Sequence, residues 1–216
     1  MLAYQGSLFG SGPPGVSGTV AVERQHLDEH SWIDHAHGWL HGADMLLADL
    51  ATTLRWRTGS RPMYGRIVDE PRLHAHLDVD LVAARPALSD IVDALQRRYG
   101  PGLRPGVVNY YRAGSDSVAW HADRVGTRPV DPIVAIVSLG GPRRFGLHPM
   151  YGGQGRRIVL HSGDLLVMGG ACQHHWEHSI PKMRHAPPRM SLTYRCVDDS
   201  PERAWWSEAV DHDSRG

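Results

Sequence analysis

A histidine and an aspartate stand two positions apart in Trp120-His121-Ala122-Asp123, and several histidines follow in His174-His175-Trp176-Glu177-His178. In an extended strand, residues i and i+2 point the same way, so His121 and Asp123 can direct an imidazole nitrogen and a carboxylate oxygen at one ion. A third ligand must come from elsewhere, and residues 174–178 are the candidate region. The spacing His-x-Asp is also common by chance, and a surface His beside an unrelated Asp would produce it.

Two histidines and one carboxylate on one face of an octahedral ion leave three positions open, which is the arrangement of non-haem Fe(II) oxygenases. A zinc site would instead form a closed tetrahedron or keep a single open position. The chain has two cysteines, Cys172 and Cys196, which provide neither a disulfide framework nor a multi-Cys zinc motif. These residues therefore favour an iron site over a zinc site.

Two arginines lie six residues apart in Arg189-Met190-Ser191-Leu192-Thr193-Tyr194-Arg195. In a strand both side chains face the same side. An inward-facing Arg without a partner is costly, and a dicarboxylate co-substrate would satisfy it through bidentate, charge-assisted hydrogen bonds. One structural Arg–carboxylate pair and one exposed Arg would also explain this pattern.

The 216 residues suffice for one domain with a core, and 41% hydrophobic and 21% charged residues are typical of a globular protein. The formal net charge is zero, which argues against a general polyanion binder. However, residues 51–189 hold 18 Arg and one Lys against 11 acidic residues, a net of +8 between acidic ends. This distribution is compatible with a phosphate-bearing ligand, although chance would also produce it.

Short apolar runs bounded by Gly, Pro, Asp or Ser predict strands after residue 100, and two helices are expected before them. The helices are expected near 43–54 and 89–99, and the stretch 63–77 can add strands limited by Pro71. His161-Ser162-Gly163-Asp164 is expected to close a hairpin between its flanking strands. The fold class expected is mainly β with flanking helices (α+β), a sandwich or jelly roll. The expected strands are Val107–Tyr111, Ile133–Leu139, Arg157–Leu160, Leu165–Met168 and Met190–Tyr194.

Several separated motifs in this order resemble the AlkB-type family of Fe(II)- and 2-oxoglutarate-dependent dioxygenases over roughly residues 60–196. They are Asn109-Tyr110-Tyr111, His121-x-Asp123, His161-Ser162-Gly163-Asp164, His178 and Arg189-x₅-Arg195. The resemblance implies a double-stranded β-helix, with Fe(II), 2-oxoglutarate and O₂ as cofactor and co-substrates. It implies His121, Asp123 and His178 as catalytic iron ligands, and Asn109, Tyr111, Arg189 and Arg195 as contacts to 2-oxoglutarate. His174 and His175 are then expected in the wall or at the surface.

The resemblance also implies an activity: oxidative demethylation of N-alkylated bases in DNA or RNA, with hydroxylation of the alkyl group and release of formaldehyde. Such bases are reached by flipping them from the stack. Tyr64 and Arg66, around a loop that in some relatives inserts into the duplex, and Arg124 are the expected substrate contacts. An ordinary half-buried strand residue is the other reading of Tyr64. Val125 departs from the family, since well-known members carry an acidic base-reading residue there.

Two other functions remain open at this stage. An Fe(II)/2-oxoglutarate oxygenase of a protein or small-molecule substrate would keep the iron site, whereas a non-catalytic nucleic-acid-binding module would use the metal structurally. The N-terminus lacks the pattern of a signal peptide, and no apolar run approaches the ~20 residues that cross a bilayer. We therefore expect a cytoplasmic monomer without a membrane partner. We expect residues 1–60 to be an extension with a helix packed on the core, 61–196 the dioxygenase domain and 197–216 an acidic tail.

Overall fold

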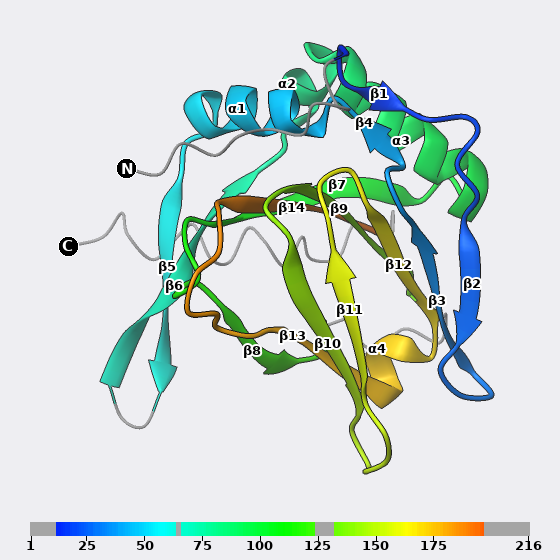
Figure 1. Ribbon diagram of the computed structural model, residues 1–216, viewed down its shortest axis with the longest axis vertical. Coiled ribbons are helices and arrows are strands. Elements are labelled where there is room, and N and C mark those ends of the chain that lie inside the picture. The colour runs from blue at the N-terminus through cyan, green and yellow to red at the C-terminus, as the bar shows by residue number, and fades with distance from the viewer. Residues whose placement is uncertain (1–11, 64–65, 124–131, 197–216) are drawn as a thin grey trace, which may run out of the picture.

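The computed structural model describes residues 12–63, 66–123 and 132–196, with the side chains of 61–63 and 66–69 left out of the description. Three antiparallel sheets and four helices make up this part of the chain (Figure 1). The helices are α1 (Ala43–Thr53), α2 (Val79–Ala83), α3 (Pro86–Tyr99) and α4 (Cys172–His175).

An eight-stranded sheet forms one layer and a four-stranded sheet the other. In spatial order, the large sheet consists of β2 (Glu23–His26), β3 (Ser31–Ala36), β12 (Leu165–Gly170), β9 (Val134–Gly140), β14 (Arg189–Cys196), β7 (Leu103–Tyr111), β6 (Arg66–His76) and β5 (Arg57–Met63). The small sheet consists of β11 (Arg156–Leu160), β10 (Arg143–Pro149), β13 (Trp176–Ile180) and β8 (Val118–His121). A third, two-stranded sheet pairs β1 (Gly15–Val16) with β4 (Leu40–His41).

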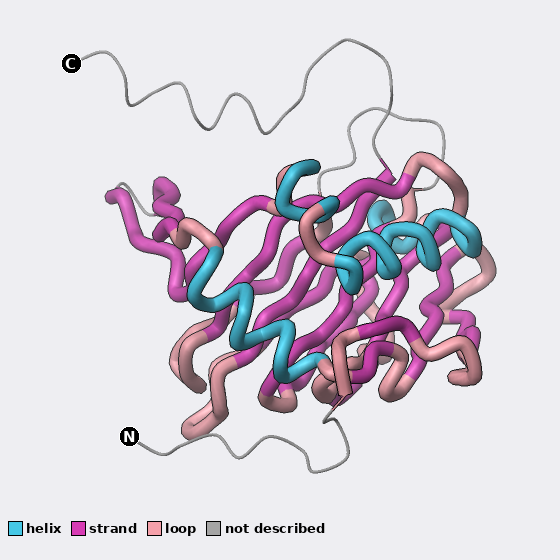
Figure 2. Tube along the Cα trace, turned by 90° about the horizontal axis from the view of Figure 1, so that it is seen from above, coloured by secondary structure: helices cyan, strands magenta, loops and turns pink. Residues whose placement is uncertain are grey.

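Successive side chains on the central strands of the large sheet point to opposite faces. Both faces are buried, one against the small sheet and the other against the helices. On β9, Val134 and Ile136 pack toward the small sheet, while Val137 and Leu139 pack toward the helices. Figure 2 shows α1 and α3 lying across one face of the strands. α1 and α3 place Leu46, Leu50, Leu88, Ile91 and Leu95 in that outer core. The two sheets with an apolar interior form the expected jelly roll, with helices on its outer face.

Most of the expected elements are present, and the helix expected at 89–99 begins earlier, at Pro86. Proline suits the first helical position because its missing N–H would have no helical partner there. Pro71 lies within β6 at an irregularity of the β5–β6 ladder, between the pairs Thr58–Leu73 and Ser60–Asp69. The ladder is therefore interrupted where proline cannot donate a hydrogen bond.

The hairpin expected at His161–Asp164 is wrong. β11 pairs with β10, whereas β12 pairs with β3 and β9, so this turn carries the chain from the small sheet to the large one. The reason is burial: β11 exposes most of its residues and suits an edge, whereas all but the last residue of β12 are buried and require neighbours on both sides.

The segment before residue 61 contributes β2, β3 and β5 to the large sheet, and α1 packs against that sheet. The expected division of the chain near residue 60 stays a prediction, and the acidic segment 197–216 lies outside the described residues. Among the described residues, none of the helices is both long and apolar enough to cross a membrane.

Gly163 in the crossover turn provides a test of this packing. It has a φ of +84°, and an added Cβ would clash with the carbonyl oxygen of Leu40. We expect Gly163→Ala to lower the free energy of unfolding by about 3 kcal/mol, since positive φ and a backbone clash act together. Gly152→Ala is the matched control, because Gly152 has a φ of +90° and open space around it. It should cost only about 1 kcal/mol, and equal losses in urea unfolding would contradict the packing described here.

Candidate metal centre

The structure brings together the three residues that the sequence singled out as metal ligands. His121 ends β8, and His178 stands directly opposite it on β13. Asp123 follows two residues after His121. One ligand atom from each of the three side chains lies within 4.8 Å of the other two. A single ion can therefore contact all three.

The hydrogen bond of His121 orients its ring for metal binding. Its Nδ1 lies 2.9 Å from the carbonyl oxygen of Ala119, so Nδ1 carries the proton and Nε2 keeps its lone pair. Nε2 lies 3.9 Å from Oδ1 of Asp123. The centroids of the His121 and His178 rings are 4.3 Å apart. Nε2 of His121 thus faces the other two candidate ligands.

His178 is held as a neutral ring. Its ring stacks on Phe145 with centroids 5.4 Å apart, and the residue is buried. Burial lowers the pKa of His178 to about 4, against the opposing effect of the Asp123 carboxylate. A neutral imidazole is the form that binds a metal, so this ligand needs no deprotonation at pH 7.

Asp123 is fixed by two neighbours. Its backbone N–H donates to Oε1 of Gln173 at 3.1 Å, and its Oδ1 accepts from Nη2 of Arg195 at 2.7 Å. Arg195, expected at the co-substrate, is therefore also bonded to a candidate ligand. Sequence reasoning missed Gln173, which carries no signal beyond its place before His174. His174 is exposed and His175 half-buried, in agreement with the expectation that they line the wall or surface.

Arg189 is buried between the sheets, opposite Tyr111 in the β7–β14 register. Its Nε donates to Oγ of Ser138 at 3.0 Å, whereas its Nη1 has no hydrogen-bond partner among the described residues. Burial lowers the pKa of Arg189 to about 10, so it remains charged at pH 7. The guanidinium lies 5.3 Å from the Tyr111 ring centroid, and burial raises the pKa of that tyrosine. A buried cation of this kind is suited to bind an anion.

Arg143 is a second buried arginine, which sequence reasoning missed. It is 0% exposed, and its guanidinium lies 5.9 Å from the Tyr111 ring centroid. Its Nη2 donates to the carbonyl oxygen of Ala113, while Nε and Nη1 have no hydrogen-bond partner in the described part of the chain. The signal in the sequence was Arg143-Arg144, because two adjacent arginines in a strand must face opposite sides. Arg144 is the exposed member of the pair.

Asn109 lies two residues before Tyr111 on β7, so both side chains face the same side of the large sheet. Its Oδ1 accepts from Nε of Arg72 at 2.9 Å, and Arg72 also contacts Glu70 at 2.9 Å. Asn109 is thus on the expected face but is bonded to a basic side chain of β6.

The side chains expected to contact the substrate lie outside the part of the chain that the structure describes. Tyr64 and Arg124, with the departing residue Val125, lie outside the described residues, and so does the side chain of Arg66. The backbone of Arg66 begins β6.

Comparisons with known proteins agree with this geometry. A model of the 2OG-Fe(II) oxygenase superfamily matches residues 24–195. Alpha-ketoglutarate-dependent dioxygenase alkB homolog 3 of Homo sapiens is 31% identical over 194 residues, covering 76% of this chain and 65% of that protein. DNA oxidative demethylase ALKBH2 of Arabidopsis thaliana is 34% identical over 138 residues, covering 52% of this chain and 44% of that protein. The chain thus spans less than two thirds of the length of either relative.

The solved structure of OsALKBH1 shares the fold, with a TM-score of 0.51 and 16% identity over 81% of this chain and 100% of that one. The residues present also fit the group that the family uses. Two imidazoles and a carboxylate suit Fe(II), and the orphaned Nη1 of buried Arg189 suits a carboxylate of 2-oxoglutarate. The resemblance to AlkB-type dioxygenases is confirmed: the chain belongs to the 2OG-Fe(II) oxygenase superfamily, whose cofactor and co-substrates are Fe(II), 2-oxoglutarate and O₂.

Proposed function

We propose that this protein is an oxidative demethylase of N-alkylated nucleobases in DNA or RNA. The observation that carries the proposal is the convergence of His121, Asp123 and His178 within 4.8 Å, with Arg195 bonded to Asp123. When bound, Fe(II) with 2-oxoglutarate and O₂ supplies hydroxylation of an alkyl C–H bond, with succinate and CO₂ as co-products. A hydroxymethyl group on a base nitrogen then separates as formaldehyde and leaves the unmodified base.

The chain's own residues have distinct tasks in this proposal. His121, Asp123 and His178 hold the iron, and Ala119 fixes the tautomer of His121 through its carbonyl oxygen. Arg195 keeps the Asp123 carboxylate in place through its hydrogen bond to Oδ1. Arg189 and Tyr111 bind the diacid in the buried layer between the sheets, with Asn109 on the same face. Burial of these groups excludes water from the reacting atoms.

A nucleic-acid substrate is supported by the names of the relatives and by the β5–β6 hairpin. Figure 1 shows this hairpin extending away from the rest of the large sheet, of which β5 is an edge strand. Residues 51–68 contain four arginines and no acidic residue, and Arg55 and Arg57 are exposed. A basic, projecting hairpin can contact phosphates, and Tyr64, Arg66 and Arg124 stay the expected substrate contacts.

Val125 is the observation that favours a second candidate, an oxygenase of the same cofactors acting on a protein or a small molecule. A protein that recognises a base without an acidic residue at position 125 needs another hydrogen-bond acceptor for the exocyclic amine of that base. A non-catalytic binding module is disfavoured, because a structural metal gives no reason to bury Arg189 with an Nη1 that has no hydrogen-bond partner among the described residues. The monomeric state and the cytoplasmic location stay predictions.

The assay for the proposal uses Fe(II), ascorbate, 2-oxoglutarate and oligonucleotides carrying 1-methyladenine or 3-methylcytosine. We expect formaldehyde and loss of 14 mass units (about one CH₂) from the oligonucleotide, since hydroxylation releases the methyl carbon. DNA and RNA, in single and double strands, are compared. Succinate without any change in an oligonucleotide would reject the nucleobase substrate and support the second candidate.

A pair of histidine variants tests the metal ligands. His121→Ala should lower both succinate and formaldehyde by more than about 100-fold, because it removes a direct ligand rather than a supporting group. His174→Ala is the matched control, since His174 lies outside the cluster and is exposed, and it should keep wild-type rates. Circular dichroism checks that both variants fold. Equal activity of the two variants would show that His121 is not a ligand.

Arg189→Met tests the anion site by removing its charge while keeping an apolar side chain of similar length. The KM for 2-oxoglutarate should rise at least about 30-fold, because a buried charge-assisted bond is lost. The Tm without ligand should not fall, since an unpaired buried charge is replaced by packing. Arg144→Met on the exposed face of β10 is the control and should leave KM unchanged. Stabilisation by added 2-oxoglutarate in Arg189→Met equal to wild type would contradict this assignment.

A further inference from the structure

Four ionisable side chains gather at the turn where the chain crosses from the small sheet to the large one. His35 lies on β3 and His37 follows its end, while His161 and Asp164 belong to the turn between β11 and β12. Asp164 directly precedes β12, and Gly170 at the other end of β12 leads into α4, which carries Gln173 beside Asp123. Since an antiparallel strand rises about 3.4 Å per residue, this cluster and the iron site lie about a strand length apart.

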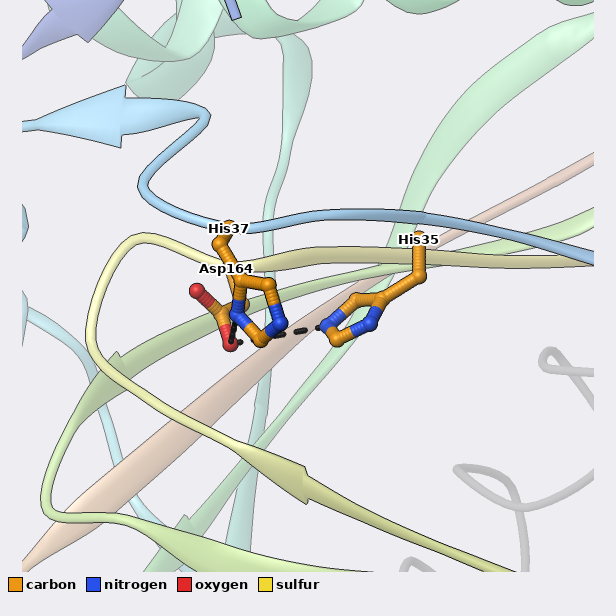
Figure 3. Close-up of side chains that lie close together, drawn as sticks. All are labelled: His35, His37 and Asp164. Atoms are coloured by element: carbon orange, nitrogen blue, oxygen red, sulfur yellow. Dashed lines mark hydrogen bonds and ion pairs between the residues drawn. The ribbon is translucent and has the colours of Figure 1, made fainter. Parts of the chain in front are cut away.

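The nitrogen atoms of the histidines converge on one carboxylate oxygen. Oδ2 of Asp164 lies 3.1 Å from Nδ1 of His37, 3.6 Å from Nε2 of His35 and 3.5 Å from Nδ1 of His161. Figure 3 shows the rings of His35 and His37 turned toward the Asp164 carboxylate. The ligand atoms of His35, His37 and Asp164 all lie within 4.8 Å of one another.

Hydrogen bonding within the cluster is incomplete. The side chain of His35 is 10% exposed, and its Nε2, which faces Asp164, has no hydrogen-bond partner among the described residues. A buried polar nitrogen without a partner costs free energy, and a ligand at this point would satisfy it. Nε2 of His35 therefore faces the Asp164 carboxylate across 3.6 Å, wider than an ordinary hydrogen bond, where one ion can contact both groups.

Asp164 is prepared as an anion. Its side chain is 1% exposed, and Oδ1 accepts from the backbone N–H of Gly38 at 3.0 Å. Oδ2 accepts from the backbone N–H of His161 at 2.9 Å. Burial acts to raise the pKa of Asp164, but His35 and these N–H groups together hold the pKa below its usual value. An ionised carboxylate surrounded by imidazole nitrogens offers a cation one negative charge and several donor atoms.

The spacing suits a particular cation. Ligands about 2.0–2.1 Å from a tetrahedral zinc ion lie about 3.3–3.4 Å from one another, close to the separations seen around Oδ2. The donors are imidazole nitrogens and one carboxylate oxygen, which zinc accepts. The backbone hydrogen bonds to Asp164 provide the outer support that such ligands need. Entry is open, because the side chains of His37 and His161 are more than half exposed.

We propose that His35, His37 and Asp164, whose ligand atoms lie within 4.8 Å of one another, bind a zinc ion. His161 lies outside that set but 3.5 Å from Asp164, and it supplies the fourth ligand. With four protein ligands the site is closed, as in structural zinc sites. It joins β3 and its following turn to the crossover turn before β12. The ion therefore fastens the N-terminal part of the large sheet to the crossing between the sheets, independently of the iron site.

The experiment uses the full chain without a histidine tag, stripped of metal with a chelator, and Co²⁺ as a spectroscopic probe in place of zinc. The background variant His121→Ala/Asp123→Ala removes the iron site, so that any remaining site is seen alone. It should bind one Co²⁺ with the intense visible absorption of four-coordinate cobalt, and Zn²⁺ should displace this signal. Added Zn²⁺ should also raise the Tm of this variant.

Adding His37→Ala/His161→Ala to that background should weaken Co²⁺ binding at least about 100-fold and abolish the tetrahedral spectrum. Both side chains are exposed, so the fold should be retained, which circular dichroism checks. His26→Ala/His30→Ala is the matched control and should leave binding unchanged, since His26 at the end of β2 and His30 just before β3 are both exposed. No Co²⁺ binding in the background variant, or a six-coordinate spectrum unaffected by His37→Ala/His161→Ala, would overturn the proposal. Neither outcome depends on oxygenase activity.

Discussion

Arg189 and Arg143 hold two positive charges inside an apolar sandwich, and both guanidinium groups lie near the ring of Tyr111. Removing an ion from water costs several kcal/mol even after the protein relaxes. Single hydrogen bonds to Ser138 and to the backbone of Ala113 offset only part of this cost. A bound diacid would supply the missing negative charge, so the protein gives up stability without its co-substrate and regains it on binding. The rest of the site is arranged around this charge.

Strand register connects that charge to the metal ligands. The β8–β13 pairing sets His178 opposite His121, and a slip of one residue would turn one ring to the other face. Asp123 lies beyond the end of β8, where no ladder fixes it, and Arg195 on β14 takes over that role. β14 therefore carries both Arg189, proposed to bind the diacid, and Arg195, which bonds to the proposed iron ligand Asp123. A shift of β14 would therefore displace both Arg189 and Arg195.

Structural features that depend on residue type and on local hydrophobic periodicity could be predicted from the sequence. Short apolar runs bounded by Gly, Pro, Asp or Ser predicted β9 and β12, and the His121, Asp123 and His178 motifs predicted which side chains meet. Pairing partners were not predictable, because a short turn with Gly looks the same whether it closes a hairpin or crosses between sheets. The roles of Arg143 and Gln173 were also hidden, since they arise from burial and from one long-range hydrogen bond. These depend on the assembled sandwich rather than on neighbouring residues.

The two ends of β12 have opposite requirements. At its far end, the proposed iron ligands near α4 would have to leave positions open for the co-substrates, so protein side chains could not close that end. At its near end, Gly163 accepts a positive φ to let the backbone pass close to Leu40, and Asp164 bonds the turn after β3. Because the open end would lack packing between the two sheets, the structure at the other end of β12 has to hold the sheets together. A metal ion held by residues from β3 and the crossover turn would place that rigidity where it does not obstruct the substrate.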